Sequence, residues 1–416
     1  MKYSRYLKTG TIVFISLFLV STASAWLDRA EPALPDIPQE WTIIDPEKVY
    51  PDFEYNGYTP SCAACPPTVD QDTGEAESFD PKFTFFVKGG TTNNLVVYFQ
   101  GGGGCWHENN CLYVHTYMEE VLDITAYNTR LMGIFDTKLV LNPFKDWYFV
   151  YIPYCTGDVH WGANDAEYPD TGNVYGGSDQ TIRHRGFVNF QVVLQWIRDN
   201  FENPEKIFVS GSSAGSYGAI MGFPYIKETF PASKVSVLGD AGNGVTTESF
   251  QTDAIENWNI QIPEWIPGFE GGYDPDMTID YVYRRIAQYY RFSKIAQFTT
   301  AWDWNQTFFY NLMVGDNIEH PETWETGWPA SWPAWNDQML DYVYSAAEMP
   351  NYRYYIAAGD YHTIMMTPDF YLERSGGIPF FRWVNAMINN PFGLWGGPLE
   401  GLWQNLECTD CEEPLP

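Results

Sequence analysis

Basic residues are scarce in this sequence. Only 23 of its 416 residues are Lys or Arg, against 53 Asp or Glu, and the formal net charge is −30 at pH 7. A surface of that sign repels nucleic acid and anionic membranes, so both are excluded as main partners. The same charge argues against a densely anionic polymer as a substrate.

Long hydrophobic runs are lacking too. The apolar run over residues 11–20 is too short to span a bilayer, and it lies between a basic start and the small-residue pattern Ala23-Ser24-Ala25. This order predicts a signal peptide over residues 1–25 and a mature chain that begins near Trp26. No Cys follows the run, which argues against a lipoprotein anchor; an uncleaved membrane anchor is the alternative. We expect a secreted or periplasmic protein.

Cysteine is present at seven positions: Cys62, Cys65, Cys105, Cys111, Cys155, Cys408 and Cys411. In an exported chain these favour disulfides. Cys105 and Cys111 are close enough to close one small loop, and Cys408 and Cys411 another. Either Cys62 or Cys65 is expected to pair with Cys155, which leaves one odd thiol. The alternative is a zinc site, because the two Cys-x-x-Cys pairs together have four-thiolate spacing.

The chain alternates between short apolar runs and helical patterns after an arm, residues 26–80, that is rich in Pro, Asp and Gly and predicted to be irregular. Strands are predicted at 95–99, 147–152, 207–209, 235–238 and 354–358, with a helix over 187–201. This alternation predicts an α/β fold, a mostly parallel sheet with helices on both faces. No repeat or linker divides residues 26–416, which are expected to form a single domain. The Trp- and Pro-rich region 250–340 is expected to be an insertion over the sheet.

The strongest chemical signal is Gly211-x-Ser213-x-Gly215, directly after the predicted strand 207–209 and before an Ala- and Gly-rich helix start. This pattern is typical of a nucleophile on a sharp strand-to-helix turn, where flanking glycines let neighbouring chain approach without a Cβ clash. The helix N-terminus places its positive end beneath the reacting oxygen. Ser213 is therefore the predicted nucleophile, with a plain small-residue turn as the alternative. Ser212 is expected only to pack.

A serine hydroxyl needs a base, and the sequence has six histidines. His362 follows the predicted strand 354–358 and comes late in the chain, as the order Ser, acid, His of this hydrolase architecture requires. It is the predicted base. His107 and His160 lie on loops after strand ends and are candidates for lining the pocket instead.

The acid that orients the base stays open between Asp240 and Asp303, because Asp360 is too close to His362 in sequence to orient it easily.

The glycines Gly101–Gly104, after strand 95–99, predict half of an oxyanion hole. Their amides, with that of Ala214, can point at the oxygen that gains charge. A phosphate-binding loop is the rival interpretation, but no Gly-Lys-Ser/Thr follows.

Together these segments resemble the pectin acetylesterase and Notum family of α/β-hydrolases. The resemblance is carried by Tyr98–Cys105, Ile152–Asp158, Gly211–Ser216 and Ala301–Gln306. It implies an α/β-hydrolase fold and the hydrolysis of carboxylic esters.

Carried over residue by residue, the resemblance makes Ser213 the nucleophile, His362 the base and Asp303, in the family's Asp-x-x-Gln pattern, the acid. It places oxyanion donors at Gly102, Gly103 and Ala214, and it implies a disulfide between Cys105 and Cys111. Animal members have a Trp where Gly103 stands, so that side chain's contact in the pocket does not transfer.

The predicted function is that of a secreted serine carboxylesterase that cleaves an acetyl or other acyl ester, from a small molecule or a glycan, through an acyl-enzyme on Ser213. No metal or other cofactor is expected. The acids at Asp274, Asp276 and Asp280 are more typical of a solvated loop than of a calcium site. A non-catalytic carbohydrate-binding protein on the same fold and a serine peptidase are the alternatives.

Overall fold

The structure, a computed structural model, describes residues 34–69, 76–127, 131–324, 328–389, 399 and 401–412. The predicted signal peptide lies outside these residues. Contacts divide the chain into residues 1–34 and residues 35–416, and the fold is that of the second unit. Within the described part, no helix combines the length and the apolar character that crossing a membrane requires.

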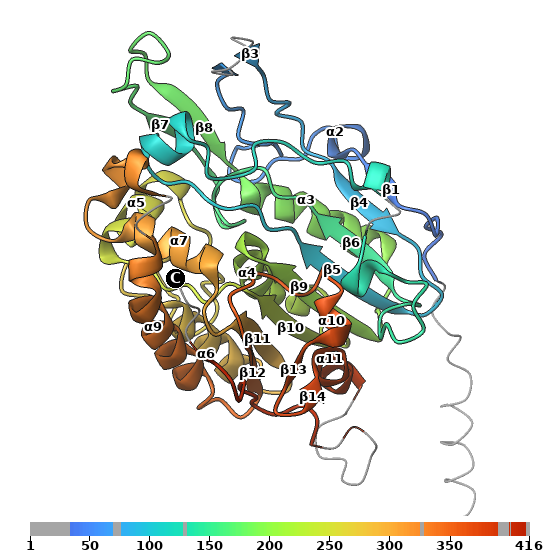
Figure 1. The fold of residues 1–416 in the computed structure, drawn as a ribbon. Helices are drawn as coiled ribbons and strands as arrows, with labels where there is room; N and C mark the ends of the chain where they lie inside the picture. The colour runs from blue at the N-terminus through green and yellow to red at the C-terminus, as the bar shows by residue number, and fades with distance from the viewer. Residues whose placement is uncertain are drawn as a thin grey trace, which may run out of the picture. The chain divides into compact units, whose positions relative to one another are not determined.

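A sheet of eight strands runs through this unit in the order β1-β4-β6-β5-β9-β10-β11-β12 (Figure 1). From β6 to β12 neighbouring strands are parallel, whereas β4 pairs antiparallel with both β6 and β1. The predicted mostly parallel sheet is thereby confirmed. In the order of the sheet, the strands are Thr42–Ile44, Phe85–Lys88, Tyr148–Ile152, Asn94–Phe99, Lys206–Ser212, Lys234–Asp240, Ile295–Thr300 and Tyr352–Ala357.

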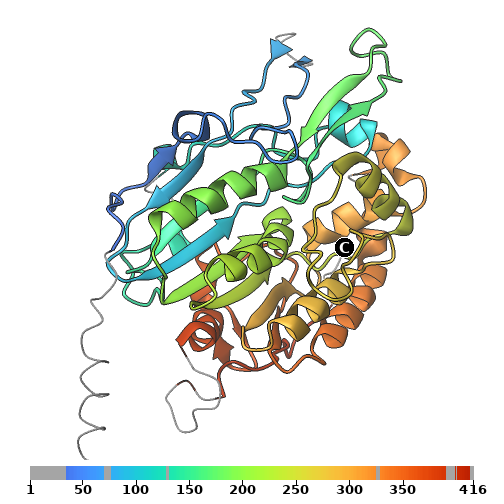
Figure 2. The same cartoon turned by 180° about the vertical axis from the view of Figure 1, so that it is seen from behind.

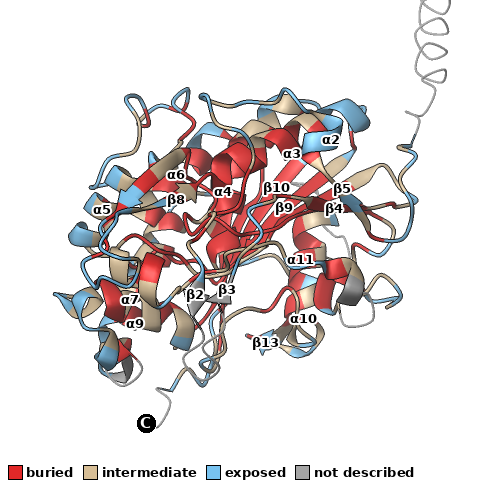
Figure 3. Cartoon of the chain, turned by 90° about the horizontal axis from the view of Figure 1, so that it is seen from above, coloured by how far each residue is buried: buried red, intermediate tan, exposed pale blue. Residues whose placement is uncertain are grey.

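Helices cover both faces of the sheet. Successive side chains of a strand point to opposite faces, so each strand contributes residues to both packed layers. Leu95, Val97 and Phe99 of β5 pack with α3 (Gly186–Asn200), α4 (Ala214–Thr229), α6 (Ile279–Tyr289) and α9 (Trp332–Ala346). The alternate residues, Val96 and Tyr98, pack with α10 (Asp369–Leu372) and α11 (Phe380–Asn389). Figure 2 shows α3 and α4 lying across the first face, and Figure 3 shows the buried residues gathered on the central strands and α4.

The remaining elements are short or lie outside the main sheet. They are α2 (Pro46–Val49), β2 (Thr68–Val69), β3 (Ala76–Glu77), η1 (Asn109–Tyr113), η2 (Ile124–Tyr127), η3 (Gly133–Phe135), β7 (Asn164–Tyr168), β8 (Gln180–His184), α5 (Glu248–Trp258), α7 (Trp304–Met313), η4 (Asn317–Glu319), η5 (Pro321–Thr323), η6 (Trp328–Ser331), β13 (Arg374–Ser375) and β14 (Ile378–Pro379).

In the main sheet, β4 is not among the predicted strands, and two regions differ from the sequence-based expectation. The N-terminal arm supplies an edge strand, β1, and so is not irregular throughout. Region 250–340 is not one insertion over the sheet, because it contains β11, which lies between β10 and β12. Polar residues hide this strand in the sequence: Gln297 and Thr299 are buried. Their groups are hydrogen-bonded inside the fold, Gln297 for example accepting from the Tyr352 hydroxyl at 2.7 Å.

Three disulfides are present: Cys62–Cys155, Cys105–Cys111 and Cys408–Cys411. They use thiols that the zinc alternative needs, so the four-thiolate site does not form. Cys65 is the odd thiol and is buried. Burial raises the pKa of the Cys65 thiol to about 12, so it stays protonated and unreactive at neutral pH.

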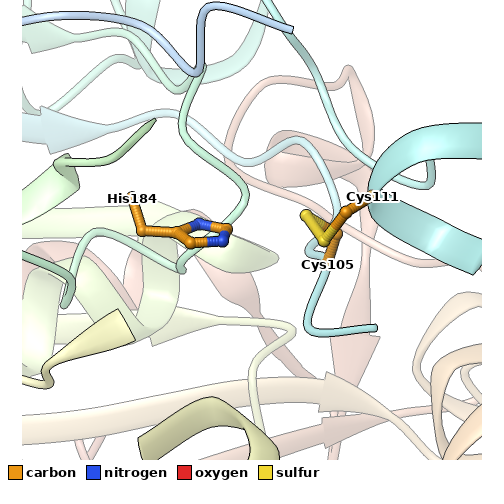
Figure 4. Close-up of side chains that lie close together, drawn as sticks. All are labelled: Cys105, Cys111 and His184. Carbon is orange, nitrogen blue, oxygen red and sulfur yellow. A yellow bond between two sulfur atoms is a disulfide. The ribbon is translucent and has the colours of Figure 1, made fainter. Parts of the chain in front are cut away.

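Figure 4 shows a group of described residues whose ligand atoms lie within 4.8 Å of one another, close enough to hold a metal ion: Cys105, Cys111 and His184. The two sulfur atoms are bonded to each other. The His184 ring nitrogens are also engaged, Nδ1 with the Thr156 carbonyl and Nε2 with the Tyr168 hydroxyl, each at 2.8 Å. This group therefore offers no free ligand atom.

Candidate active site

The predicted catalytic residues follow strands at one edge of the sheet. Ser213 follows β9, Asp303 comes shortly after β11, and His362 after β12. Because the carboxyl ends of parallel strands meet at the same edge, these positions converge. The chain order reverses between β5 and β9. The glycine loop after β5 and Ser213 thus flank the kind of crevice in which open α/β sheets bind ligands.

The turn that carries Ser213 has a strained backbone. Ser213 adopts φ 56° and ψ −126°, and α4 begins at the next residue. A Cβ at Gly211 would lie 2.1 Å from the Gly215 carbonyl oxygen, and one at Gly215 would lie 2.0 Å from that of Phe99. No side chain fits at either glycine, which is the reason expected from the sequence. The turn presents Ser213 at the head of a helix, where the dipole favours negative charge.

We expect Gly215→Ala to destabilise the fold by about 1–3 kcal/mol or more, because β5 must move to admit the added methyl group. Gly104→Ala is the matched control, since a Cβ there meets no atom closer than 3.5 Å. Urea unfolding of the two variants checks this. Equal midpoints would contradict the tight approach of β5 to the Ser213 turn.

The glycine loop keeps amides free beside Ser213. Within the described part of the chain, the amides of Gly102, Gly103 and Ala214 donate no hydrogen bond to another residue. Gly103 has φ +76°, and a Cβ there would lie 2.0 Å from the Thr116 carbonyl oxygen. The backbone therefore requires glycine at 103. Free amides of this kind can stabilise a negatively charged oxygen.

His362 and Asp303 are in direct contact. The His362 Nδ1 lies 2.9 Å from Asp303 Oδ1 and 2.8 Å from Oδ2. The Asp303 side chain is fully buried and also caps α7, accepting from the amides of Asn305 at 3.0 Å and Gln306 at 2.9 Å. The Gln306 side chain donates to Oδ2 at 2.9 Å. These fixed donors hold the carboxylate in one orientation toward the histidine.

The electrostatics of His362 suit a base. Burial lowers its pKa, but the charge and the hydrogen bond of Asp303, with the charge of Asp240, outweigh burial and raise the pKa above its ordinary value. The other ring nitrogen, Nε2, is buried and has no hydrogen-bond partner among the described residues. An unpartnered nitrogen on the side of the ring away from the carboxylate is available to take a proton.

Asp240 and Ser212 have a different role from the one considered in the sequence. The Asp240 carboxylate accepts from Ser212 Oγ and from the amides of Ile364 and Met365, and no hydrogen bond joins it to His362. The expectation that Ser212 only packs is therefore wrong. The sequence carries no signal for this pairing, because Ser212 occupies the first variable position of Gly211-x-Ser213-x-Gly215 and Asp240 ends a strand 28 residues later.

His107 and His160 do not line either of the cavities beside Ser213. His160 is buried, its Nε2 hydrogen-bonded to the Gln100 carbonyl at 2.8 Å, and burial lowers its pKa to about 4. His107 Nδ1 accepts from the Asn109 amide. His115 lines one cavity instead.

Two cavities meet at Ser213 and His362. The first, about 850 Å³ counting its open mouth, is lined mainly by apolar and aromatic side chains, including Trp106, Trp161, Phe250, Trp258 and Met313. The second is wider, about 1500 Å³, and carries polar groups: Gln100, His115, Thr116, Asn305 and Thr363, beside Trp304 and Phe308. Gly103, Asn305 and Phe309 line both. The nucleophile candidate thus lies where a mainly apolar cavity meets a wider one that carries more polar groups.

Part of the chain is similar to known carboxylesterases. Residues 81–259 match the pectinacetylesterase family model. Pectin acetylesterase 11 of Arabidopsis thaliana is 27% identical over 157 residues, 37% of this chain and 38% of that protein. Palmitoleoyl-protein carboxylesterase NOTUM of Homo sapiens is 23% identical over 199 residues, 41% of this chain and 37% of that protein. The matches thus span well under half the length of these relatives.

A solved structure extends the likeness to more of the fold. The Wnt deacylase Notum from Drosophila superposes with a TM-score of 0.53 over 74% of this chain and 87% of that chain, at 16% sequence identity. Together with the strand order, this establishes the α/β-hydrolase-like fold that the sequence predicts.

Proposed function

We propose that this chain, a member of the pectin acetylesterase and Notum family, is a serine carboxylesterase that cleaves an acyl ester through an acyl-enzyme on Ser213. One observation carries the proposal. Buried Asp303 fixes Nδ1 of His362, while Nε2 stays unpartnered beside the cavities that Ser213 lines.

In this mechanism His362 Nε2 takes the Ser213 hydroxyl proton as Oγ attacks the ester carbonyl. Asp303 keeps the proton on Nδ1 and stabilises the imidazolium that forms. The amides of Gly102, Gly103 and Ala214 bind the oxyanion of the tetrahedral intermediate. The imidazolium then protonates the leaving alcohol, and water, activated by the same histidine, releases the acid. No metal or cofactor takes part in these steps.

We assign the acyl group and the alcohol part of the ester to different cavities. The apolar cavity suits the acyl group, because burying a hydrocarbon chain against its aromatic side chains is favourable. It has few polar groups that could form hydrogen bonds with an alcohol. The wider cavity suits the alcohol part. Its polar groups, beside the Trp304 side chain, which is 43% exposed, fit a polyhydroxylated alcohol such as a sugar.

We expect kcat/KM for 4-nitrophenyl esters to rise from acetate through butyrate to octanoate. Each methylene buried in the apolar cavity contributes about 0.8 kcal/mol, or about fourfold in kcat/KM, until the cavity is filled. A steady-state comparison of the ester series measures this.

Narrowing the cavity provides the matched test. Thr246 lines the apolar cavity and is half-buried. Thr246→Phe is expected to depress octanoate hydrolysis while acetate hydrolysis stays near wild type. Thr246→Val, which replaces the hydroxyl that accepts from the Gln251 side chain with a methyl group of similar size, serves as the control. A wild-type optimum at acetate would contradict the assignment of this cavity to the acyl group.

The same proposal places the enzyme outside the cytoplasm. The three disulfides support an oxidising compartment outside the cytoplasm.

Serine peptidase activity is the competing function on the same residues. Hydrolysis of peptides without hydrolysis of aryl esters would favour it, and esters without peptides would favour the esterase.

A further inference from the structure

A second carboxylate lies beneath the proposed catalytic residues. Asp240 ends β10, between β9, which leads to Ser213, and β11, which leads to Asp303. Its side chain is fully buried. Among the described residues, no Lys or Arg forms an ion pair with it, so the protein holds this carboxylate by hydrogen bonds alone.

On one side Asp240 is tied to the turn of the nucleophile. The Ser212 hydroxyl donates to its Oδ2, and the Tyr98 hydroxyl lies 2.6 Å from the same Ser212 oxygen. The backbone carbonyl of Asp240 accepts from the Ser213 amide at 2.7 Å. Both the side chain and the main chain of Asp240 thus fix the strained turn.

On the other side Asp240 is tied to the loop of the base. The Ile364 amide lies 3.2 Å from each carboxylate oxygen, and the Met365 amide lies 3.0 Å from Oδ2. These amides come two and three residues after His362. One carboxylate therefore joins the two segments that must be aligned for proton transfer, in addition to the Asp303 contact.

Such a buried charge costs stability rather than adding to it. Burial raises the pKa of Asp240 to about 6, although the bonds from Ser212, Met365 and Ile364 and the charge of His362 oppose this rise. Burial raises the pKa of two neighbouring tyrosines, Tyr98 of β5 and Tyr361 beside His362, and the charge of Asp240 adds to this rise. An apolar or neutral residue would be cheaper to bury.

We propose that Asp240 is a positioning residue of the hydrolase: its carboxylate bridges the Ser213 turn and the His362 loop and so sets the alignment of nucleophile and base. The inference rests on the proposed esterase function. A misalignment of about 1 Å between reacting groups costs about 100-fold in rate.

The test compares Asp240→Asn with Asp158→Asn. Asp158 is the matched control, because it is equally buried, burial raises its pKa to about 6 as well, and it is held by hydrogen bonds from Thr156, His160, Gly162 and Gly186, away from both segments. For Asp240→Asn we expect kcat to fall about 100-fold with KM within about twofold. Asp158→Asn should change kcat by less than about threefold at a temperature where it is folded.

The pH profile adds a readout that a purely structural role would not move. Ionised Asp240 favours the imidazolium of His362 and helps to raise its pKa. Removing that charge lowers the His362 pKa, so the acid limb of kcat/KM shifts to lower pH in Asp240→Asn and stays in place in Asp158→Asn. Ser212→Ala removes only one partner of the carboxylate, and it should lower kcat by a smaller factor with the same KM.

The outcomes separate the two claims. A wild-type protein without Ser213-dependent ester hydrolysis would be a failure of the proposed function. An active wild type with equal losses in Asp240→Asn and Asp158→Asn, or with no loss in Asp240→Asn, would overturn the positioning role alone. If Asp240→Asn does not fold, an unchanged kcat in Ser212→Ala overturns it in the same way.

Discussion

Ser213→Ala is expected to lower kcat for aryl-ester hydrolysis by about 10⁶-fold while leaving the fold intact. In the proposed mechanism the Ser213 hydroxyl forms the acyl-enzyme, and Ser213 occupies the strained turn before α4. Removing a serine nucleophile from an enzyme of this mechanism costs about this factor, because base and acid then have nothing to activate. Steady-state assays at matched pH, with circular dichroism to verify folding, measure the change.

Ser216→Ala is the control for this variant, since Ser216 lies three residues further along and is fully buried. It should keep activity within a few-fold of wild type. Residual rate above the uncatalysed reaction is expected in Ser213→Ala, because the free amides and the apolar cavity still bind the ester. Activity in Ser213→Ala close to that of Ser216→Ala would mean that another residue is the nucleophile.

Asp303→Asn is expected to lower kcat by about 10⁴-fold. The carboxylate accepts hydrogen bonds from His362 Nδ1, two amides and the Gln306 side chain. The side-chain amide of an asparagine cannot accept all four of these hydrogen bonds, because its NH₂ group would point at N–H groups that also donate. The histidine then favours the tautomer with the proton on Nε2, which cannot take the Ser213 proton. Activity in the plateau region of the pH profile measures the loss.

The pH dependence of Asp303→Asn has a defined sign. The charge and hydrogen bond of Asp303 raise the His362 pKa against the effect of burial. Without the charge the pKa falls, so the acid limb of kcat/KM moves to lower pH although the plateau is far lower. Asp360→Asn is the control, because this carboxylate is exposed and two residues from His362. Equal activity in the two variants would exclude Asp303 as the acid.

The strands that the sequence predicts all have unbroken apolar runs, although β4, which also has one, is not among them. Leu95–Phe99 and Ile207–Val209 lie within β5 and β9 because burial on both faces demands apolar residues throughout. β11 escaped prediction because Gln297 and Thr299 occupy buried positions. β1 escaped because it is a three-residue edge strand, of which Ile43 is exposed. Tertiary contacts, not local pattern, define both.

The candidate site divides in the same way. Spacing alone predicts the tight turn at Ser213, because the turn needs glycines two residues away on each side. Spacing alone does not separate Asp240 from Asp303, since each comes at or shortly after the end of a neighbouring parallel strand at the same edge. The resemblance favoured Asp303, and the structure brings that carboxylate to His362. The bridge from Asp240 to Ser212 and Met365 depends on the register of three segments, which no local pattern encodes.

Mapping a fluorophosphonate adduct tests the central claim most directly. The probe reacts with a serine only where a base activates it and amides stabilise the developing oxyanion. We predict one adduct per chain, located by peptide mass spectrometry on Ser213, and its absence in Ser213→Ala and strong reduction in Asp303→Asn. An adduct on another residue, or none at a pH where the protein hydrolyses esters, would contradict the account.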